Sequence, residues 1–124
     1  MSNILMKEES YRIVGICMAV HRELGMGFQE IIYKDALEIE FIAQKIPFKR
    51  ELRYEIFYKG RLLPHSYSAD FVVYDSIILE VKATSLIVGS FVKQTINYLK
   101  ASHLQLGIIA NFGCRSFESK RIVF

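Results

Sequence analysis

The stretch DFVVYDSIILEVK, residues 70–82, decides how this chain folds. It covers most of two runs with the composition of β-strands, Tyr67–Tyr74 and Ile77–Lys82, which a tight turn joins. Side chains alternate between the faces of a strand, so Glu80 and Lys82 point the same way, roughly 6–7 Å apart. Charged side chains are rarely buried without a partner, so an acid and a lysine on one face of an apolar strand need a reason.

Asp70 is a second acid inside an apolar strand. A hairpin reflected about Asp75-Ser76 does not set Asp70 directly opposite Glu80, and only a register offset or a bulge brings the two together. The sequence leaves this register open. Carboxylates at strand ends supply the oxygen ligands that Mg²⁺ and Mn²⁺ prefer, and a nearby lysine is suited to stabilise charge on a phosphate. The alternative is a salt bridge between Glu80 and Lys82 on a solvated face.

The composition indicates a single folded domain, residues 1–124. Hydrophobic residues make up 52% of the chain and charged residues 23%, which excludes a disordered protein. The net charge of +3 permits an anionic partner without requiring one. Cys17 and Cys114 fit no metal-binding spacing and are expected to be small buried residues, as suits a protein of the reducing cytoplasm. The longest apolar run, Ile13–Val20, is too short to span a membrane.

Apolar spacing predicts two helices ahead of the first strand. Residues 8–24 carry one apolar stripe that ends at a Gly-Met-Gly break, residues 25–27. His21, just before the break, is expected to pack or to cap the helix, with catalysis as the less favoured role. Residues 28–44 form the second predicted helix. Its apolar stripe comprises Phe28, Ile31, Ile32, Leu37, Phe41 and Ile42.

Strands and one more helix account for the rest of the chain. The predicted elements are a strand at 48–58, a turn at 59–60, a return strand begun at 61–63 and interrupted by Pro64, a helix at 86–101 capped by Thr84 or Ser85, a buried strand at 104–110 and an edge strand at 120–124. The strand at 104–110 would run parallel to the strand of Glu80, through a helical crossover.

The region from 45 to 61 is basic and interleaved with aromatic residues. This composition suits contact with a phosphate backbone. An exposed hairpin of mixed charge is the slightly favoured alternative, and the sequence alone does not decide between them.

Three motifs resemble those of known nucleases. Asp70, a gap of nine residues and then Glu80-x-Lys82 resembles the core signature of the PD-(D/E)XK nuclease superfamily. Gly27-x-x-Glu30-x-x-Tyr33 is the namesake motif of the GxxExxY family, which is assigned to that superfamily. Gln94-x-x-x-Tyr98 resembles a motif of its RecB-like members. The likeness runs from about His21 to the C-terminus, with one departure: Ala69 stands where the signature has proline.

This resemblance implies an α/β fold with a restriction-endonuclease-like αβββαβ core, an additional N-terminal helix and a mixed central sheet flanked by helices. It also implies a nuclease that depends on Mg²⁺ or Mn²⁺ and acts on DNA or RNA. The implied roles are metal binding by Asp70, Glu80 and the Val81 carbonyl, metal or metal-water binding by Glu30, activation of water by Lys82, and positioning of the substrate or Lys82 by Gln94, Tyr98 and Tyr33. A core position is an equally open reading of Tyr33.

A second interpretation keeps the fold without the catalysis. The chain is small for a self-sufficient nuclease and has no obvious DNA-reading domain, so it would serve as a nucleic-acid-binding or protein-interaction module. Such a module would form a homodimer or serve a larger protein partner.

Overall fold

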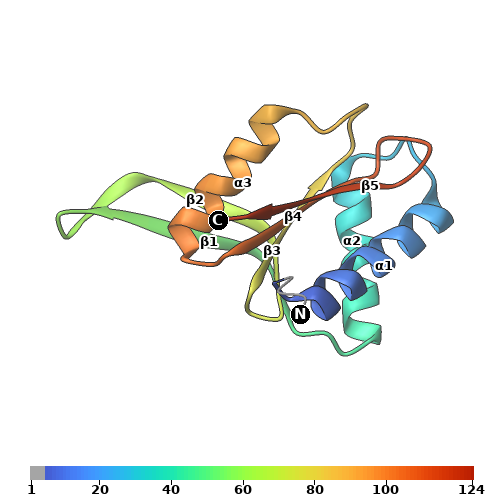
Figure 1. Ribbon diagram of the computed structural model, residues 1–124, viewed down its shortest axis with the longest axis horizontal. Coiled ribbons are helices and arrows are strands. Elements are labelled where there is room, and N and C mark those ends of the chain that lie inside the picture. The colour runs from blue at the N-terminus through green and yellow to red at the C-terminus, as the bar shows by residue number, and fades with distance from the viewer. Residues whose placement is uncertain (1–4) are drawn as a thin grey trace.

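The computed structural model describes residues 5–124 as one mixed sheet with helices on both faces (Figure 1). In chain order the elements are α1 (Lys7–Leu24), α2 (Glu30–Ala43), β1 (Phe48–Tyr58), β2 (Arg61–Val73), β3 (Ile77–Lys82), α3 (Gly89–Ser102), β4 (Leu106–Asn111) and β5 (Glu118–Val123). The strands lie in the order β1-β2-β3-β4-β5, with β3 and β4 parallel and every other pair antiparallel. The predicted α/β class and mixed sheet are therefore confirmed.

Two apolar clusters fill the space on either side of the sheet. Leu79 and Val81 of β3 pack in the cluster beneath α1 and α2, whereas Ile78 packs in the cluster beneath α3. Both central strands are buried on both faces, as expected where a helical crossover joins parallel strands. Glu80 and Lys82 share the parity of Ile78, so β3 directs them toward α3.

The predicted apolar stripe of α2 is wrong in part. Phe28, Ile31, Ile32 and Ile42 are exposed, while Tyr33, Leu37 and Phe41 are fully buried. The buried residues are spaced by four, so they form one narrow stripe along the helix. An isoleucine-rich helix offers several possible faces, and the sequence does not show which face meets the sheet.

Two details of the strands and caps also differ from the predictions. Pro64 does not end its strand, because β2 runs unbroken from Arg61 to Val73. The pairing with β1 shifts register between Glu55 and Phe57, and a proline is tolerated beside such an irregularity. Neither Thr84 nor Ser85 caps α3, which begins after Val88. The described helices include none long and apolar enough to cross a membrane.

Tyr33 closes the loop between α1 and α2. Its hydroxyl donates a hydrogen bond to the Gly25 carbonyl oxygen at 2.7 Å and accepts one from the Phe28 backbone N–H at 3.2 Å. Its ring stacks on Phe112, with ring centroids 4.6 Å apart. Gly27 has open space around its α-carbon but a φ of +110°, so backbone conformation and not close approach requires glycine there.

His21 and the cysteines take structural positions. His21 is 8% exposed, and its Nε2 lies 2.8 Å from the Cys114 carbonyl oxygen, so it packs as expected and ties α1 to the loop after β4. Cys17 is fully buried as expected. Cys114 is only half buried, and its Sγ contacts the Ser85 carbonyl oxygen and the Glu118 carboxylate, so its surroundings are more polar than predicted.

We predict that Tyr33→Phe lowers the free energy of unfolding by about 0.5–1.5 kcal/mol, because the partly buried Gly25 carbonyl and the Phe28 N–H lose their shared partner. Denaturant unfolding followed by circular dichroism measures the change. Tyr11→Phe is the control, since Tyr11 is 82% exposed, and it should shift stability by less than about 0.5 kcal/mol. Equal effects of the two substitutions would contradict the role given to the Tyr33 hydroxyl.

Candidate active site

The site lies where β2 and β3 part. Their ladder contains only the pairs Val73↔Ile77, Val72↔Ile78 and Phe71↔Leu79. Beyond these pairs, side chains take over the hydrogen bonds of the backbone. The Asp70 N–H donates to Glu80 Oε2 at 2.8 Å, and the Val81 N–H donates to Asp70 Oδ2 at 2.8 Å. Each carboxylate thus accepts a hydrogen bond from a backbone N–H of the opposite strand, and these bonds hold the two carboxylates close together.

The turn sets the register that the sequence left open. Three residues, Tyr74 to Ser76, separate the paired Val73 and Ile77, and the Ser76 N–H donates to the Val73 carbonyl oxygen at 3.1 Å. Tyr74 and Asp75 both have positive φ, 56° and 54°. Extended by one step, this register places Asp70 opposite Glu80. The offset that the metal-binding interpretation needed is therefore present.

Glu80 is 3% exposed and lies in an unusual electrostatic environment. Burial and then the negative charge of Asp70 raise the pKa of Glu80 to about 8, against the opposing effects of the Asp70 N–H, Lys82 and Lys34. Burial raises the pKa of Tyr98 as well, and the charges of Glu80 and Asp70 add to the shift. Tyr98 therefore lies beside the two acids. Its ring packs edge-on against Tyr67, with centroids 5.4 Å apart.

Lys82 is held by α3. Its Nζ donates to Gln94 Oε1 at 3.2 Å and lies 4.5 Å from the centroid of the Phe91 ring. A cation over an aromatic face and a fixed amide oxygen restrict a side chain that is otherwise flexible. No direct ion pair joins Lys82 to Glu80 among the described residues, so the alternative of a simple Glu80–Lys82 surface pair does not describe this strand.

Sequence reasoning missed Lys34 and Glu51. Lys34 Nζ of α2 lies 3.0 Å from Asp70 Oδ1 and 2.6 Å from Glu51 Oε1, and its side chain is 12% exposed. Burial alone would lower the pKa of Lys34, but its hydrogen bonds to the two carboxylates and their charges raise it. The only sequence signal for Lys34 is its place one helical turn after Glu30, on the same face of α2.

Asn111 fixes the chain that leaves the site. It is fully buried at the end of β4, paired in register with Lys82 of β3. Its Oδ1 accepts the N–H groups of Thr84 and Gly113, at 3.0 and 3.1 Å, and its Nδ2 donates to the Thr84 carbonyl oxygen at 3.0 Å. A Cβ atom on Gly113 would collide with the Thr84 backbone. Asn111 therefore anchors the segment immediately after Lys82.

The other predicted residues lie farther from this centre. Glu30, at the start of α2, is exposed, and its side chain has no ion pair or hydrogen bond within residues 5–124. Tyr33 is buried in the core between α1 and α2 and does not face the site. Val81 contributes its N–H to Asp70, and the metal-binding role of its carbonyl stays a prediction.

The donors present fit a hard divalent cation in part. In residues 5–124, no three Asp, Glu, His or Cys side chains gather closely enough to hold a metal ion. Asp70 and Glu80 do converge, and burial and then the negative charge of Asp70 raise the pKa of Glu80. Carboxylate oxygens are the ligands that Mg²⁺ and Mn²⁺ prefer. The chemistry of this pair fits two ligands of such a cation, and within residues 5–124 no third carboxylate gathers with them.

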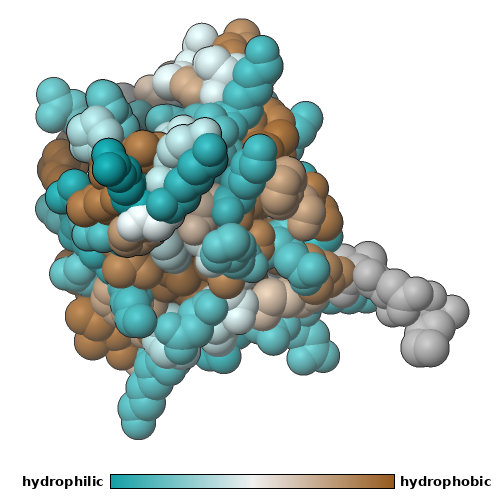
Figure 2. All heavy atoms as spheres, turned by 90° about the vertical axis from the view of Figure 1, so that its left-hand side faces the viewer, coloured by the Kyte–Doolittle hydropathy of each residue, from teal (hydrophilic) through white to brown (hydrophobic). Residues whose placement is uncertain are grey.

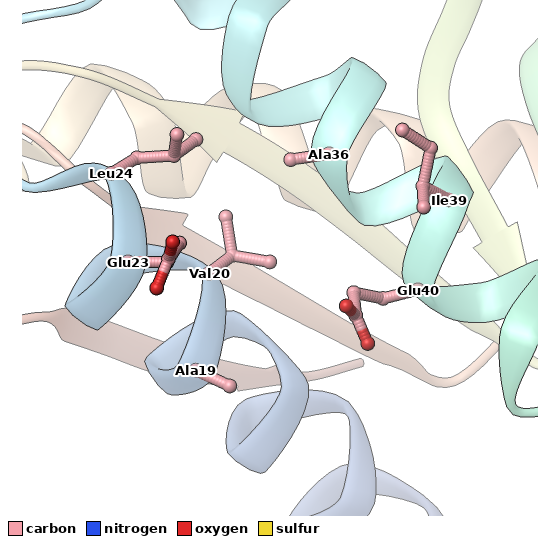
Figure 3. Close-up of a pocket in the computed structure, with 7 residues that line it drawn as sticks. All are labelled: Ala19, Val20, Glu23, Leu24, Ala36, Ile39 and Glu40. Atoms are coloured by element: carbon pink, nitrogen blue, oxygen red, sulfur yellow. The ribbon is translucent and has the colours of Figure 1, made fainter.

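A cavity of about 340 Å³ lies elsewhere, between α1 and α2 (Figure 3). Apolar side chains line most of it, together with Glu23 and Glu40. None of the residues around Asp70 and Glu80 borders it, so this hollow is separate from the candidate chemistry.

The helices, the sheet and the acids at the parting of two strands define a restriction-endonuclease-like fold. Residues 7–122 match the PD-(D/E)XK nuclease superfamily, and the chain belongs to it. The solved structure titled "Crystal structure of SSO0001" is similar, with a TM-score of 0.61 and 19% sequence identity over 74% of this chain. The match spans 49% of that chain, about half its length. No curated protein matches the sequence. Members of the superfamily generally use divalent metals such as Mg²⁺.

We predict that the metal-free protein loses stability as the pH rises from about 5 to 8. A carboxyl whose pKa is raised on folding binds more protons in the folded state, so stability is full below its ordinary value of 4.5 and falls up to about 8. The slope should approach about 1.4 kcal/mol per pH unit. Urea unfolding with a chelator, at each pH, measures this. Glu80→Gln should flatten the profile, whereas the exposed control Glu55→Gln should not. Parallel profiles in wild type and Glu80→Gln would refute the assignment.

Proposed function

We propose that this chain is a Mg²⁺- or Mn²⁺-dependent nuclease that hydrolyses phosphodiester bonds of DNA or RNA. The observation that carries the proposal is the reciprocal pair of hydrogen bonds that holds Asp70 and Glu80 together beside Lys82. Two carboxylates and a restrained ammonium group thus lie at one end of β3, which supports a metal-dependent site. Membership of the superfamily supports the reaction class.

Each side chain has a distinct task in this proposal. Asp70 and Glu80, with the Val81 carbonyl, would hold the metal ion, which lowers the pKa of a bound water and offsets charge on the phosphate. In hydrolysis the water oxygen bonds to phosphorus, the bond to the departing sugar oxygen breaks, and that oxygen gains a proton as the water loses one. Lys82 orients the water or stabilises the negative charge of the transition state. Gln94 keeps the Lys82 ammonium aimed at the site.

The assignment to the GxxExxY family is part of the proposal. The structure gives two of the motif residues a physical role, because Gly27 adopts a positive φ and Tyr33 ties the loop before α2. This loop sets the position of α2 and hence of the helix face that approaches Asp70. Glu30 would act through a metal-bound water, since its exposed side chain lies on the first turn of that helix.

The hairpin of β1 and β2 supports a nucleic-acid substrate. It projects beyond the helices in Figure 1, and Figure 2, which views the molecule from that side, shows hydrophilic and hydrophobic side chains interleaved. Phe57, Tyr58 and Leu62 are exposed there, beside the basic Lys59 and Arg61. Exposed aromatics with lysine and arginine suit stacking on bases and contact with phosphates. The tip of the hairpin, at Lys59, lies roughly 26 Å from Glu51 along the strand. This distance equals the length of about eight base pairs of a nucleic-acid duplex.

We predict that Asp70→Asn and Glu80→Gln each abolish Mn²⁺ binding, measured by isothermal titration, and metal-dependent cleavage of single- or double-stranded nucleic acid. Each removes a negative ligand while keeping the shape of the side chain. Asp75→Asn is the matched control, since this acid lies in the turn that joins β2 to β3 and its side chain is 77% exposed. Equal Mn²⁺ binding by wild type and Asp70→Asn would exclude this metal site.

The projecting hairpin also favours the second candidate function, a binding module without catalysis. We predict that Lys59→Glu with Arg61→Glu weakens nucleic-acid binding and reduces its salt dependence, because two positive charges near phosphates are reversed. Fluorescence anisotropy at several salt concentrations measures both effects. Mn²⁺ binding should not change, because the tip is distant from Asp70. Salt-dependent binding by the wild type without cleavage, and unchanged in Asp70→Asn, would establish the module and reject the nuclease.

A further inference from the structure

Lys34 contacts two carboxylates at the site, and no motif of the sequence assigns it a role. Its ammonium lies between two carboxylates, 3.0 Å from Asp70 Oδ1 and 2.6 Å from Glu51 Oε1. Its side chain is only 12% exposed. Surface ion pairs contribute little and are readily solvated, but a lysine this buried is ordered by its partners.

The backbone is distorted to complete this cluster. Glu51 has a φ of 56°, in the left-handed region that residues other than glycine rarely adopt. The neighbouring pairs Arg50↔Phe71 and Leu52↔Ala69 place Glu51 across from Asp70. A left-handed residue costs on the order of 1 kcal/mol, and such strain persists where the surrounding structure demands it. Here it accompanies the approach of the Glu51 carboxylate to Lys34.

The two oxygens of Asp70 have different partners. Oδ1 accepts from the Lys34 ammonium, and Oδ2 accepts from the Val81 N–H. Asp70 therefore bridges a positive charge on one side and the strand that carries Glu80 on the other. Lys82, in contrast, bonds to the neutral amide of Gln94. The two lysines are thus held by different chemistry at different edges of the same site.

We propose that Lys34 is a built-in second cation of the active site, which supplies at Asp70 Oδ1 the positive charge that two-metal nucleases take from a second ion. In two-metal sites, paired cations stabilise both the attacking and the departing oxygens of a phosphoryl transfer. This chain has a fixed ammonium beside one shared carboxylate. It therefore binds one divalent cation, and Lys34 acts as a positioning residue that keeps Asp70 in place. The inference rests on the proposed nuclease function.

Metal stoichiometry tests the proposal independently of activity. Mn²⁺ is titrated into the full chain by calorimetry, with circular dichroism to confirm folding. Wild type should bind one Mn²⁺. Lys34→Gln frees Asp70 Oδ1 and Glu51, so it should bind a second, weaker Mn²⁺, and the double variant Lys34→Gln/Glu51→Gln should return to one. Lys34→Arg keeps the charge and should bind one. Lys49→Gln is the matched control, since Lys49 is an exposed lysine that pairs with Asp75.

Each result has a distinct meaning. One Mn²⁺ per chain with wild-type affinity in both Lys34→Gln and wild type would overturn the inference and leave the nuclease proposal intact. No Mn²⁺ binding by wild type would overturn the metal site itself and this inference with it. If Lys34→Gln does not fold, Lys34→Arg decides the matter through cleavage. Activity within about tenfold of wild type supports a need for positive charge at this position, whereas a larger loss would overturn the inference.

Discussion

The site depends on one substitution of partners: the carboxylates of Asp70 and Glu80 replace backbone carbonyls as acceptors where β2 and β3 part. A ladder that continued would bury these side chains in a regular sheet, with no room for a ligand. A ladder that simply stopped would leave backbone N–H groups unpaired at a cost of about 1–3 kcal/mol each. Acids of this length satisfy the donors and still keep lone pairs for a cation. The same feature that ends the sheet therefore gathers the acids.

A change of face in β2 accompanies this parting. Ala69 packs in the cluster beneath α3, while Phe71, two residues on, packs in the cluster beneath α1 and α2. In a regular strand these two residues would share a face. Asp70 lies between them at the point of inversion, and Glu51, across from it, has a left-handed backbone. Asp70 can therefore reach Lys34 on α2 while it also binds the β3 backbone. Both layers of the molecule contribute to the site.

Much of the fold and part of the site follow from local patterns. The strand period places Glu80 and Lys82 on one face, and the helical period places Gln94 and Tyr98 on one face of α3. Local patterns do not predict the roles of Lys34 and Glu51, because the contacts of these residues depend on which face of α2 meets the sheet. The isoleucines of the predicted stripe mislead on this point, since Ile31, Ile32 and Ile42 are all exposed. The left-handed backbone at Glu51 and Tyr74 is also not predictable, because neither position has the glycine or asparagine that usually indicates this conformation.

Charge balance connects these observations. Around the parting of the strands lie three acids, Asp70, Glu80 and Glu51, and two lysines, Lys34 and Lys82. With every group ionised, the cluster carries one net negative charge, and protonation of Glu80 removes it. Burial is the main cause that raises the pKa of Glu80, and the negative charge of Asp70 adds to it. A divalent cation would leave one net positive charge with Glu80 ionised, and a phosphodiester monoanion would neutralise it. A second divalent cation would leave two uncompensated positive charges, so charge balance supports the proposal of one metal ion beside a fixed lysine.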